Sequence, residues 1–403
     1  MSEGTLRILH TGDWRLNMAC QGIPYYPETM APKLSTAVFD SVSKIVDFAL
    51  SENVDAFVIG GNVLEPEFAA PSDYDFIYQQ LCRLNVAAIP VVWGWSPQDK
   101  RAHWPRCIEW PANVKFLVGD TPLAVEIPMK TGVTVSFLGM EPNSDQPIQL
   151  AQFNGINKGN LTLGVAYGEL SCTDEIPECK HWLLTGAGYR QISLDNGARA
   201  YYCGSPLGRD TTELGPHGCA LLDLDENGVI EHQFINTSRV EYHLKAVTVS
   251  DVASPEELSN LIEESIHDAS WDDSTLNIIQ IDVANANENL EALPLLQTYH
   301  AFHSLLQRRL NEMGSHLLFA GLSLTTSASE RSSNERELLG EFLFELRKLQ
   351  EQGWESLPLH KFLESETNST WCSLDEDLLG LRILRGAESL GRHLLSRIEK
   401  DVA

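Results

Sequence analysis

The feature that most constrains the fold is an alternation of short apolar strands with helical segments over residues 1–240. The opening segment 5–14 is apolar and stops at Gly12 and Asp13, which predicts a buried strand with an aspartate at its carboxyl end. A helical stripe over 34–50 follows, and then a second strand over 55–61. Continuous apolar strands between helices predict an α/β layered domain whose site lies where the strands end.

The chain divides by pattern into three parts, as its 403 residues also suggest. Residues 1–240 carry the alternation and close in turns rich in glycine and proline. Residues 241–328 predict a small α+β capping domain. A serine-rich linker then leads into 329–403, a helical C-terminal region with two amphipathic segments. These helices are expected either to dock on a partner or to pack on their own domain.

The net charge of −27 bears on nucleic-acid binding. Tight binding to a nucleic-acid backbone rests on clustered lysines and arginines, so this acidity argues against strong DNA binding by the chain alone. A local basic patch is conceivable, and an ordinary solvated loop is the simpler interpretation of the same segment. Its residues are Lys100, Arg101, His103 and Arg106.

Cellular location and cysteine chemistry follow from two further patterns. The sequence has no stretch of about 20 apolar residues and no leader-like start, so the cytoplasm is the expected location. The eight cysteines are scattered without a CxxC pair, which predicts reduced thiols rather than a zinc site or disulfides.

Six segments of the chain resemble the signature of the calcineurin-like metallophosphoesterases. Within that family they are most similar to the SbcD/YhaO group of DNA-repair exonuclease subunits. The last of the six is long and ungapped, and it is the most specific. In chain order, HTGDWRL (10–16) is similar to HTSDWHLG, FVIGGNVLEP (57–66) to LIAGDLFD, IPVVWGWSPQD (89–99) to IPV-x-x-x-GNHD, LGVAYG (163–168) to a strand that ends in a metal-binding histidine, LLTGAGYRQ (183–191) to LGHIHxxQ, and CGSPLGRDTTELGPHGC (203–219) to PGSPxGRxxxExGPKGC.

The resemblance implies a four-layer α/β/β/α metallophosphoesterase sandwich, followed by the small α+β domain and the helical tail. It also implies a centre of two manganese ions held by seven or eight His, Asp and Asn donors. Such ions lower the pKa of a bridging water and stabilise the phosphoryl oxygens.

Most of the family's metal-ligand positions are substituted in this sequence, so no catalytic residue is intact. Asp13 matches its ligand, and Asn62 is a neutral donor in place of the bridging Asp. Two divalent ions are not held by these residual donors alone, and therefore no metal cofactor is expected. The other substitutions are Arg15 for His, Trp95 and Ser96 for the Asn and His of GNHD, Pro97 for its Asp, Tyr167 for the lone His, and Ala187 and Tyr189 for the last two His.

Arg15 brings a permanent positive charge into the metal region. One hypothesis is that its guanidinium neutralises Asp13 in place of a metal, while Tyr167, Tyr189 and Trp95 fill the emptied cavity. The alternative is that Arg15 points into solvent.

A one-metal site rebuilt from nearby side chains is a further alternative. The simpler interpretation makes His10 a hydrogen-bonded core histidine and Glu65 and Asp99 ordinary loop acids, and it gives His181, at the start of a strand, no role. The residues considered for a rebuilt site are His10, Glu65, Asp99, His103 and Glu169.

The best-matched motif contributes structural residues. Its turns are expected to shape the rim of the site and the hairpin that follows. The rim residues are Gly204, Ser205, Pro206, Gly208 and Arg209, and those of the hairpin are Gly215, Pro216 and Gly218.

Three functions are consistent with these observations. The first is a catalytically inactive scaffold or regulatory subunit of an SMC-like coiled-coil ATPase of the SbcC/YhaN type, because members of the group work as dimers joined to such an ATPase through C-terminal helices. Residues 375–400 fit such a docking helix, and DNA contact would be weak or indirect. The second is an active metal-dependent exonuclease or phosphodiesterase with an atypical site. The third is a nucleotide- or ligand-binding protein that uses the former active site.

Overall fold

The computed structural model describes most of the chain before residue 326, and it divides into two compact units. The first unit comprises 1–243, 271–279 and 316–320, and the second comprises 244–270, 280–315 and 321–403. The predicted tail 329–403 lies outside the described residues except for Lys348. The described residues are 5–23, 26–130, 132–142, 148–156, 161–170, 178–195, 197–225, 228–249, 254–267, 269–284, 296–325 and 348.

The first unit contains a six-stranded sheet, here called the first sheet, in the order β12-β11-β1-β2-β3-β4. Its four strands from β1 to β4 are parallel, whereas β11 and β12 are antiparallel to their neighbours. The bounds are β1 Leu6–Thr11, β2 Ala56–Ile59, β3 Val91–Trp93, β4 Val114–Phe116, β11 Gly218–Asp225 and β12 Gly228–Asn236.

A second six-stranded sheet, here called the second sheet, has the order β5-β6-β7-β8-β10-β9. The inner strands β6, β7, β8 and β10 are parallel, and the edge strands β5 and β9 are antiparallel to them. The bounds are β5 Leu123–Pro128, β6 Thr134–Gly139, β7 Leu161–Tyr167, β8 His181–Thr185, β9 Arg190–Ser193 and β10 Arg199–Tyr202.

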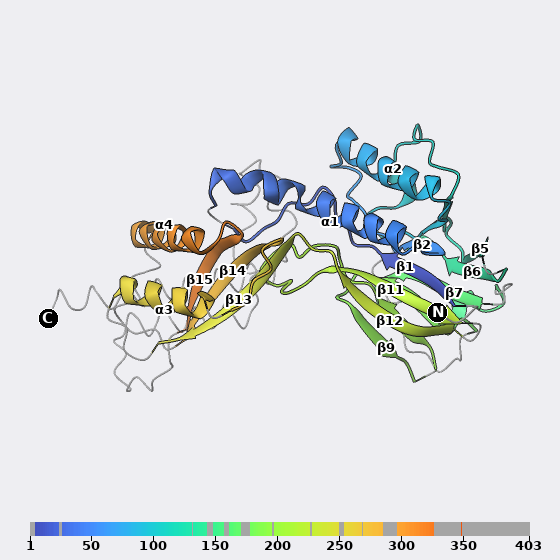
Figure 1. Cartoon of the computed structure of the whole chain (residues 1–403). Coiled ribbons are helices and arrows are strands. Elements are labelled where there is room, and N and C mark those ends of the chain that lie inside the picture. Colours follow the sequence, from blue (N-terminus) through green and yellow to red (C-terminus); the bar gives the residue numbers. More distant parts are fainter. Residues whose placement is uncertain are drawn as a thin grey trace. The chain divides into compact units, whose positions relative to one another are not determined.

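Apolar side chains on both faces of the first sheet create the layers (Figure 1). Leu9 and its neighbours pack with the buried faces of α1 (Ala31–Ser51) and α2 (Pro71–Val86). Ile8 points the other way and packs between the two sheets. The alternation of side chains along a strand therefore builds a helix layer on one face and a sheet-to-sheet core on the other.

The outer face of the second sheet is covered differently. Phe153 of the short 3-10 helix η3 (Leu150–Phe153) packs edge-on against Trp182, with ring centroids 4.8 Å apart. The mixed α/β class predicted from the sequence is confirmed. The fourth, helical layer remains a prediction, because the described residues on this face contribute a 3-10 helix and loops. Two other 3-10 helices are η1 (Glu28–Met30) and η2 (Arg101–His103).

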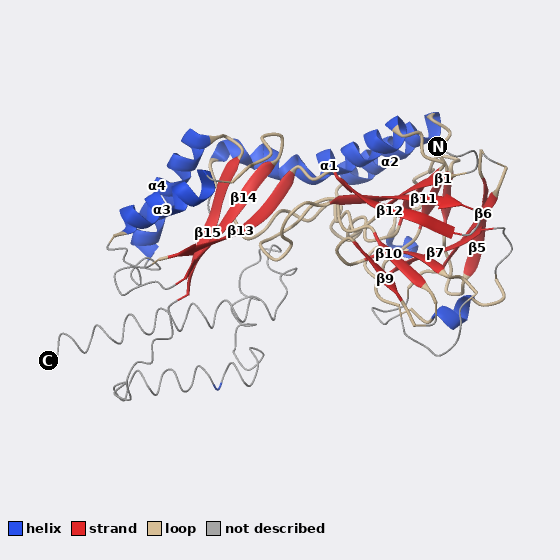
Figure 2. Ribbon diagram, turned by 60° about the horizontal axis from the view of Figure 1, so that its bottom comes forward, coloured by secondary structure: helices blue, strands red, loops and turns tan. Residues whose placement is uncertain are grey.

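A further sheet has three strands in the order β13-β14-β15 (Figure 2). The described residues of the second unit include the helices α3 and α4, and Arg309 on α4 forms an ion pair of 3.0 Å with Glu263 on α3. None of the helices in the described part of the chain has the length and apolar character that a membrane crossing requires. The bounds are β13 Val240–Thr248, α3 Pro255–His267, β14 Leu276–Ala284, α4 Leu296–Met313 and β15 Leu317–Thr325.

Candidate active site

The carboxyl ends of parallel strands from both sheets meet at one edge of the first unit. Residues 12–18, 60–66 and 94–104 follow β1, β2 and β3 and are called the first-sheet loops. Residues 168–170 and 186–189 follow β7 and β8 and are called the second-sheet loops. Open α/β folds place their sites at such strand ends.

Thr185, the last residue of β8, joins the two sheets here. Its hydroxyl donates a hydrogen bond of 2.6 Å to the carbonyl oxygen of Gly60. A Cβ atom on Gly12 or Gly60 would come within 2.2 or 2.3 Å of the Thr185 side chain. Glycine at both positions therefore allows the close approach of the sheets.

The first-sheet loops hold an unusual backbone conformation. Asp13, Arg15 and Asn62 have φ angles of 52°, 47° and 54°, in the left-handed region that non-glycine residues rarely adopt. The amide of Asp13 donates to the carbonyl of Gly61 at 2.8 Å, and that of Arg15 donates to Asn62 at 3.1 Å. Gly61 itself has a φ of 102°, and a Cβ there would lie 2.6 Å from the backbone carbon of Trp95. Strained positions of this kind persist only where their surroundings hold them, and they concentrate at functional sites.

The side chains of this backbone form a charged network. The Asn62 amide donates a hydrogen bond to the Asp13 carboxylate. The Arg15 Nη2 atom lies 3.5 Å from Asp13 Oδ2 and 2.9 and 3.0 Å from the two carboxylate oxygens of Glu213. Burial tends to lower the pKa of Arg15, but the charges of Asp13 and Glu213 outweigh it, so the pKa is raised above its ordinary value. Arg15 is thus a cation held between two carboxylates and does not point into solvent.

Glu213 was not singled out from the sequence, although it stands within the best-matched motif, 203–219. Its carboxylate also accepts a hydrogen bond of 2.9 Å from the backbone N–H of Arg209. Glu213 matches the glutamate of that motif, and this match could have identified it. In the structure its negative charge pairs with the positive charge of Arg15.

Arg209 stabilises the loop that follows β1 through three hydrogen bonds. Its guanidinium donates to the carbonyl oxygens of Met18 at 2.7 Å, Trp14 at 2.5 Å and Arg15 at 2.9 Å. Burial lowers the pKa of Arg209 to about 10, so the side chain stays charged at neutral pH. Arg209 therefore positions the loop that carries Arg15.

The remaining rim residues form the turn around Arg209. Gly204 has a φ of 75°, the Ser205 carbonyl accepts the Gly218 N–H at 2.8 Å, and Pro206 is buried. A Cβ on Gly208 would lie 2.6 Å from the carbonyl oxygen of Glu213. These contacts are structural.

The interpretation of Asp99 as an ordinary loop acid was wrong. Asp99 is fully buried, and its carboxylate accepts hydrogen bonds from the Val63 N–H at 2.8 Å and from the Ser96 N–H and hydroxyl at 2.7 and 2.8 Å. Burial raises the pKa of Asp99 to about 6 against the opposing effect of these bonds. Ser96 and Asp99 thus tie the loops after β2 and β3 together. The Ser-x-x-Asp spacing after a strand end was the available signal.

Trp95 does not fill the site, contrary to the hypothesis above. It is 1% exposed and packs on the helix side of the first sheet, with its ring centroid 5.5 Å from that of Trp93 and 5.6 Å from that of Phe116. A large indole gains most from full burial, and an aromatic cluster on this face offers it.

The second-sheet loops present few polar groups to the site. Tyr167 packs near Gly186, where a Cβ would lie 3.0 Å from its ring, and it interacts electrostatically with Arg15. Tyr189 instead stacks on His232 with centroids 4.5 Å apart and donates to the His232 carbonyl at 2.7 Å. Ala187 has no polar side-chain atom. Among the three aromatic residues expected to fill the cavity, only Tyr167 lies beside Arg15.

The side chains considered for a rebuilt metal site do not come together. His10 is a core histidine, but neither ring nitrogen has a hydrogen-bond partner among the described residues, and burial lowers its pKa to about 3. Glu169 is exposed and pairs with Arg190 at 3.7 Å, His103 is exposed on η2, and Glu65 is tied to Asn17 through its backbone. The described residues contain no group of three or more His, Cys, Asp or Glu side chains placed to hold an ion.

Comparisons with known proteins show what the chain is similar to. No family model matches it. It is 22% identical over 275 residues to the uncharacterized metallophosphoesterase YhaO of Bacillus subtilis (strain 168), a match that covers 64% of this chain and 67% of that protein. Two similar solved structures are a dimetal phosphatase from Danio rerio and the phosphoesterase Yfce from E. coli. They show 13% and 14% identity and TM-scores of 0.33 and 0.26, and they cover 58% and 57% of this chain and 100% of each of those chains.

The expectation that no metal cofactor takes part is contradicted by the similar protein YhaO, which is described as a metallophosphoesterase. That expectation rested on the substituted ligands, although the resemblance itself implied two manganese ions. The described residues nevertheless do not fit a two-metal centre: the Asp13 carboxylate already contacts Asn62 and Arg15, and Arg15 has no lone pair to offer an ion.

The sequence match and the positions of the motifs agree. The segments that resemble the family signature lie at the ends of β1, β2, β3, β7 and β8, where the two sheets meet. The chain therefore resembles the calcineurin-like metallophosphoesterases, as its motifs predicted, and it carries Arg15 and Glu213 at the strand ends where that resemblance places the site.

Proposed function

We propose that this chain is a DNA-repair-exonuclease-like protein of the SbcD/YhaO group that does not hydrolyse phosphodiesters and serves as a scaffold or regulatory subunit. The observation that carries this proposal is the position of Arg15. Its guanidinium lies 3.5 Å from Asp13 and 2.9 Å from Glu213, and its side chain is 15% exposed.

The network leaves no acid or base available for the reaction. A general base needs a free lone pair within reach of the water that it activates. The carboxylate of Glu213 accepts hydrogen bonds from Arg15 and from the Arg209 backbone, and that of Asp13 contacts Asn62 and Arg15. Both carboxylates therefore serve to hold the arginine.

The second-sheet loops support the same conclusion. Two-metal hydrolysis needs donors from several strand ends, because each ion takes several ligands. Ala187 and Tyr189 contribute no ligand. The side chain of Ala187 lacks polar atoms, and the Tyr189 hydroxyl donates a hydrogen bond to the His232 carbonyl. The same geometry removes the basis of the ligand-binding alternative, because neither Trp95 nor Tyr189 lines the site with an aromatic face.

The partner in this proposal is an SMC-like coiled-coil ATPase of the SbcC/YhaN type, bound in the cytoplasm by a homodimer of the chain. The similarity to YhaO and the net charge of −27 support this assignment. An acidic chain repels the DNA backbone, so the ATPase would hold the DNA.

Hydrolysis assays test the absence of activity. We expect the purified chain with millimolar manganese to cleave bis(p-nitrophenyl) phosphate and linear double-stranded DNA no faster than the Asp13→Ala variant does. Manganese-dependent turnover that Asp13→Ala abolishes would instead establish the alternative, an active nuclease with an atypical site.

A separate experiment tests the partner. The chain is co-expressed with a coiled-coil ATPase of the SbcC type from the same genome and analysed by size-exclusion chromatography with light scattering. We expect co-elution and a changed rate of ATP hydrolysis. Separate elution with an unchanged rate would refute the partner and leave the absence of hydrolysis untouched.

A further inference from the structure

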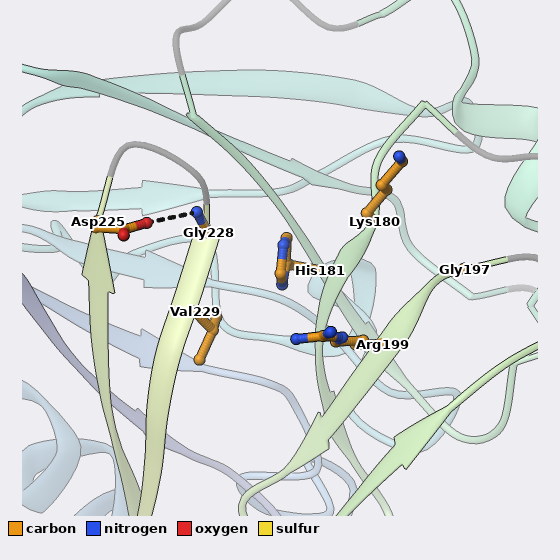
Figure 3. A pocket seen from close by; sticks show the side chains of 7 residues that line it. All are labelled: Lys180, His181, Gly197, Arg199, Asp225, Gly228 and Val229. Atoms are coloured by element: carbon orange, nitrogen blue, oxygen red, sulfur yellow. Dashed lines mark hydrogen bonds between the residues drawn. The ribbon is translucent and has the colours of Figure 1, made fainter.

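A pocket of about 380 Å³ lies in the first unit at the opposite end of β8 from the candidate active site (Figure 3). The first residues of β8 and β10 form one wall, and the ends of β11 and β12 form the other. Its volume is within the range of small-molecule sites. The residues that matter here are Lys180, His181, Arg199, Asp225, Gly228 and Val229.

The strand register brings two basic side chains together. In the parallel pairing of β8 and β10, His181 lies opposite Arg199. Figure 3 shows the imidazole and the guanidinium directed toward the strand that carries Gly228 and Val229. Lys180 precedes His181 and is exposed beside the pocket. Two nitrogen-bearing side chains thus face one space, and Lys180 lies at its margin.

A hydrogen-bond relay sets the tautomer of His181. Arg199 makes a side-chain hydrogen bond to Tyr201, and the Tyr201 hydroxyl lies 3.1 Å from His181 Nδ1. Arginine can only donate, so the tyrosine oxygen accepts from it and has its own proton available for Nδ1. When the tyrosine donates to Nδ1, the imidazole hydrogen resides on Nε2.

Gly228 lies against the imidazole of His181. A Cβ at residue 228 would lie 2.2 Å from His181 Nε2, so the strand passes the imidazole at a distance that only glycine permits. The Gly228 N–H is itself occupied, because it donates to the Asp225 carboxylate at 3.1 Å. Asp225 thus serves the turn between β11 and β12.

The pocket is positive on an acidic chain. Among its described lining residues, Lys180 and Arg199 carry fixed positive charges and only Asp225 carries a negative one. The chain as a whole carries −27. The described lining residues thus carry a net charge of +1, which favours an anion in the pocket.

We propose that this pocket binds a phosphate-type oxyanion, either free phosphate or the phosphate group of a nucleotide, through Arg199 and Lys180, beside the imidazole of His181. The planar guanidinium offers two parallel donors to such an anion, and the lysine adds a point charge. The site is separate from the strand ends that carry Asp13 and Arg15, so it does not depend on the proposed function.

Calorimetric titration tests the site with two probes, inorganic phosphate and AMP, in chloride buffer. We expect saturable binding by the full chain and a roughly tenfold weaker affinity in Arg199→Gln, because a charge-assisted hydrogen bond is lost. The matched control is Arg190→Gln, an arginine on the neighbouring strand β9 that pairs with Glu169 outside the pocket. The Arg190→Gln variant should bind both probes with the affinity of the wild type.

A second variant guards against misfolding of the first. Lys180→Gln changes an exposed side chain, so it should keep the thermal unfolding temperature and still weaken binding several-fold. Tighter binding of AMP than of phosphate would identify a nucleotide as the source of the anion, and equal binding would identify the free anion. The proposal is refuted if neither probe gives saturable heat, or if Arg199→Gln and Lys180→Gln bind as tightly as the wild type.

Discussion

The first-sheet loops and the second-sheet loops meet at one edge of the molecule, but they differ in what holds them. The first-sheet loops are tied by buried polar groups, with Asp99 fully buried between two loops and Arg209 bonded to three carbonyl oxygens. In the second-sheet loops, Glu169 is 74% exposed and Tyr189 turns toward His232. One half of the site has a strained backbone held by buried side chains, and the other half is held mainly by backbone hydrogen bonds, such as that of Gly168 to Thr185.

The strained backbone of the site lies in the first-sheet loops. Left-handed backbone at Asp13, Arg15 and Asn62 costs on the order of 1–3 kcal/mol at each position and has to be offset by surrounding contacts. The first-sheet loops supply those contacts, and they hold the Arg15 guanidinium between Asp13 and Glu213. The first half thus combines a strained backbone with a charged side-chain network.

The largest expected effect is a difference in the free energy of unfolding between a substitution in the first half of the site and one in the second. Arg209→Met leaves the carbonyls of Trp14, Arg15 and Met18 without their donor, and we expect the free energy of unfolding to fall by about 4 kcal/mol. The control Arg190→Met, in the second half, should cost about 1 kcal/mol or less, since its exposed guanidinium stacks on Tyr202 and pairs with the exposed Glu169 at 3.7 Å. Urea denaturation measures both, and equal losses would contradict the contrast.

The next effect depends on pH. The pKa of Asp99 is about 6 in the folded chain against 3.8 for the free residue, so between these values the folded state holds a proton that the unfolded state has released. The Asp99 contribution to stability therefore falls by about 3 kcal/mol as pH rises from about 4 to about 6. Unfolding free energies of the wild type and Asp99→Asn should converge or cross over this window. Parallel curves would show that Asp99 is not buried as described.

A smaller effect compares two glycines. Gly61→Ala introduces a Cβ 2.6 Å from the Trp95 backbone at a φ of 102°, whereas Gly168→Ala, at a φ of 99°, introduces one into open space. The second substitution costs only the backbone strain, about 1 kcal/mol. The first adds a steric clash, and we expect it to cost about 2 kcal/mol more. Denaturation of both variants gives the difference, and a zero difference would mean that the first-sheet loops are not tightly packed.

The smallest effect is the coupling of Arg15 to Glu213. A double-mutant cycle with Arg15→Gln and Glu213→Gln should give a coupling of about 1 kcal/mol, modest because the pair is partly exposed. The exposed pair Arg190 and Glu169, 3.7 Å apart, should give no measurable coupling. If the cycle of Arg15 and Glu213 also gave no measurable coupling, Arg15 would have no structural role in the site.

Much of this fold could be read from the sequence because its signals are local. Apolar runs such as 55–61 predicted the parallel strands, and the motif 203–219 predicted the turn around Arg209. Because the short motifs stand at predicted strand ends, the sequence also predicted that Asp13, Asn62 and Arg15 lie at one edge of the sheet. These inferences needed only periodicity and the rule that strand ends meet.

Other features depend on contacts that the sequence does not show. Asp99 and Glu65 are both acids near strand ends, and only the packing of the chain decides that the first is buried and the second is not. Trp95 and Tyr189 occupy former ligand positions, yet each turns to the aromatic neighbour that it can pack against. His181 was given no role because its partner Arg199 lies on a different strand.

The central claim is that Arg15, held by Asp13 and Glu213, is the resident cation of the candidate active site. A crystal structure of the chain grown with millimolar manganese tests it most directly. The predicted result is guanidinium density between the two carboxylates, in hydrogen-bond contact with Glu213. Arg15 turned outward, with a manganese ion coordinated by Asp13 in its place, would contradict the claim.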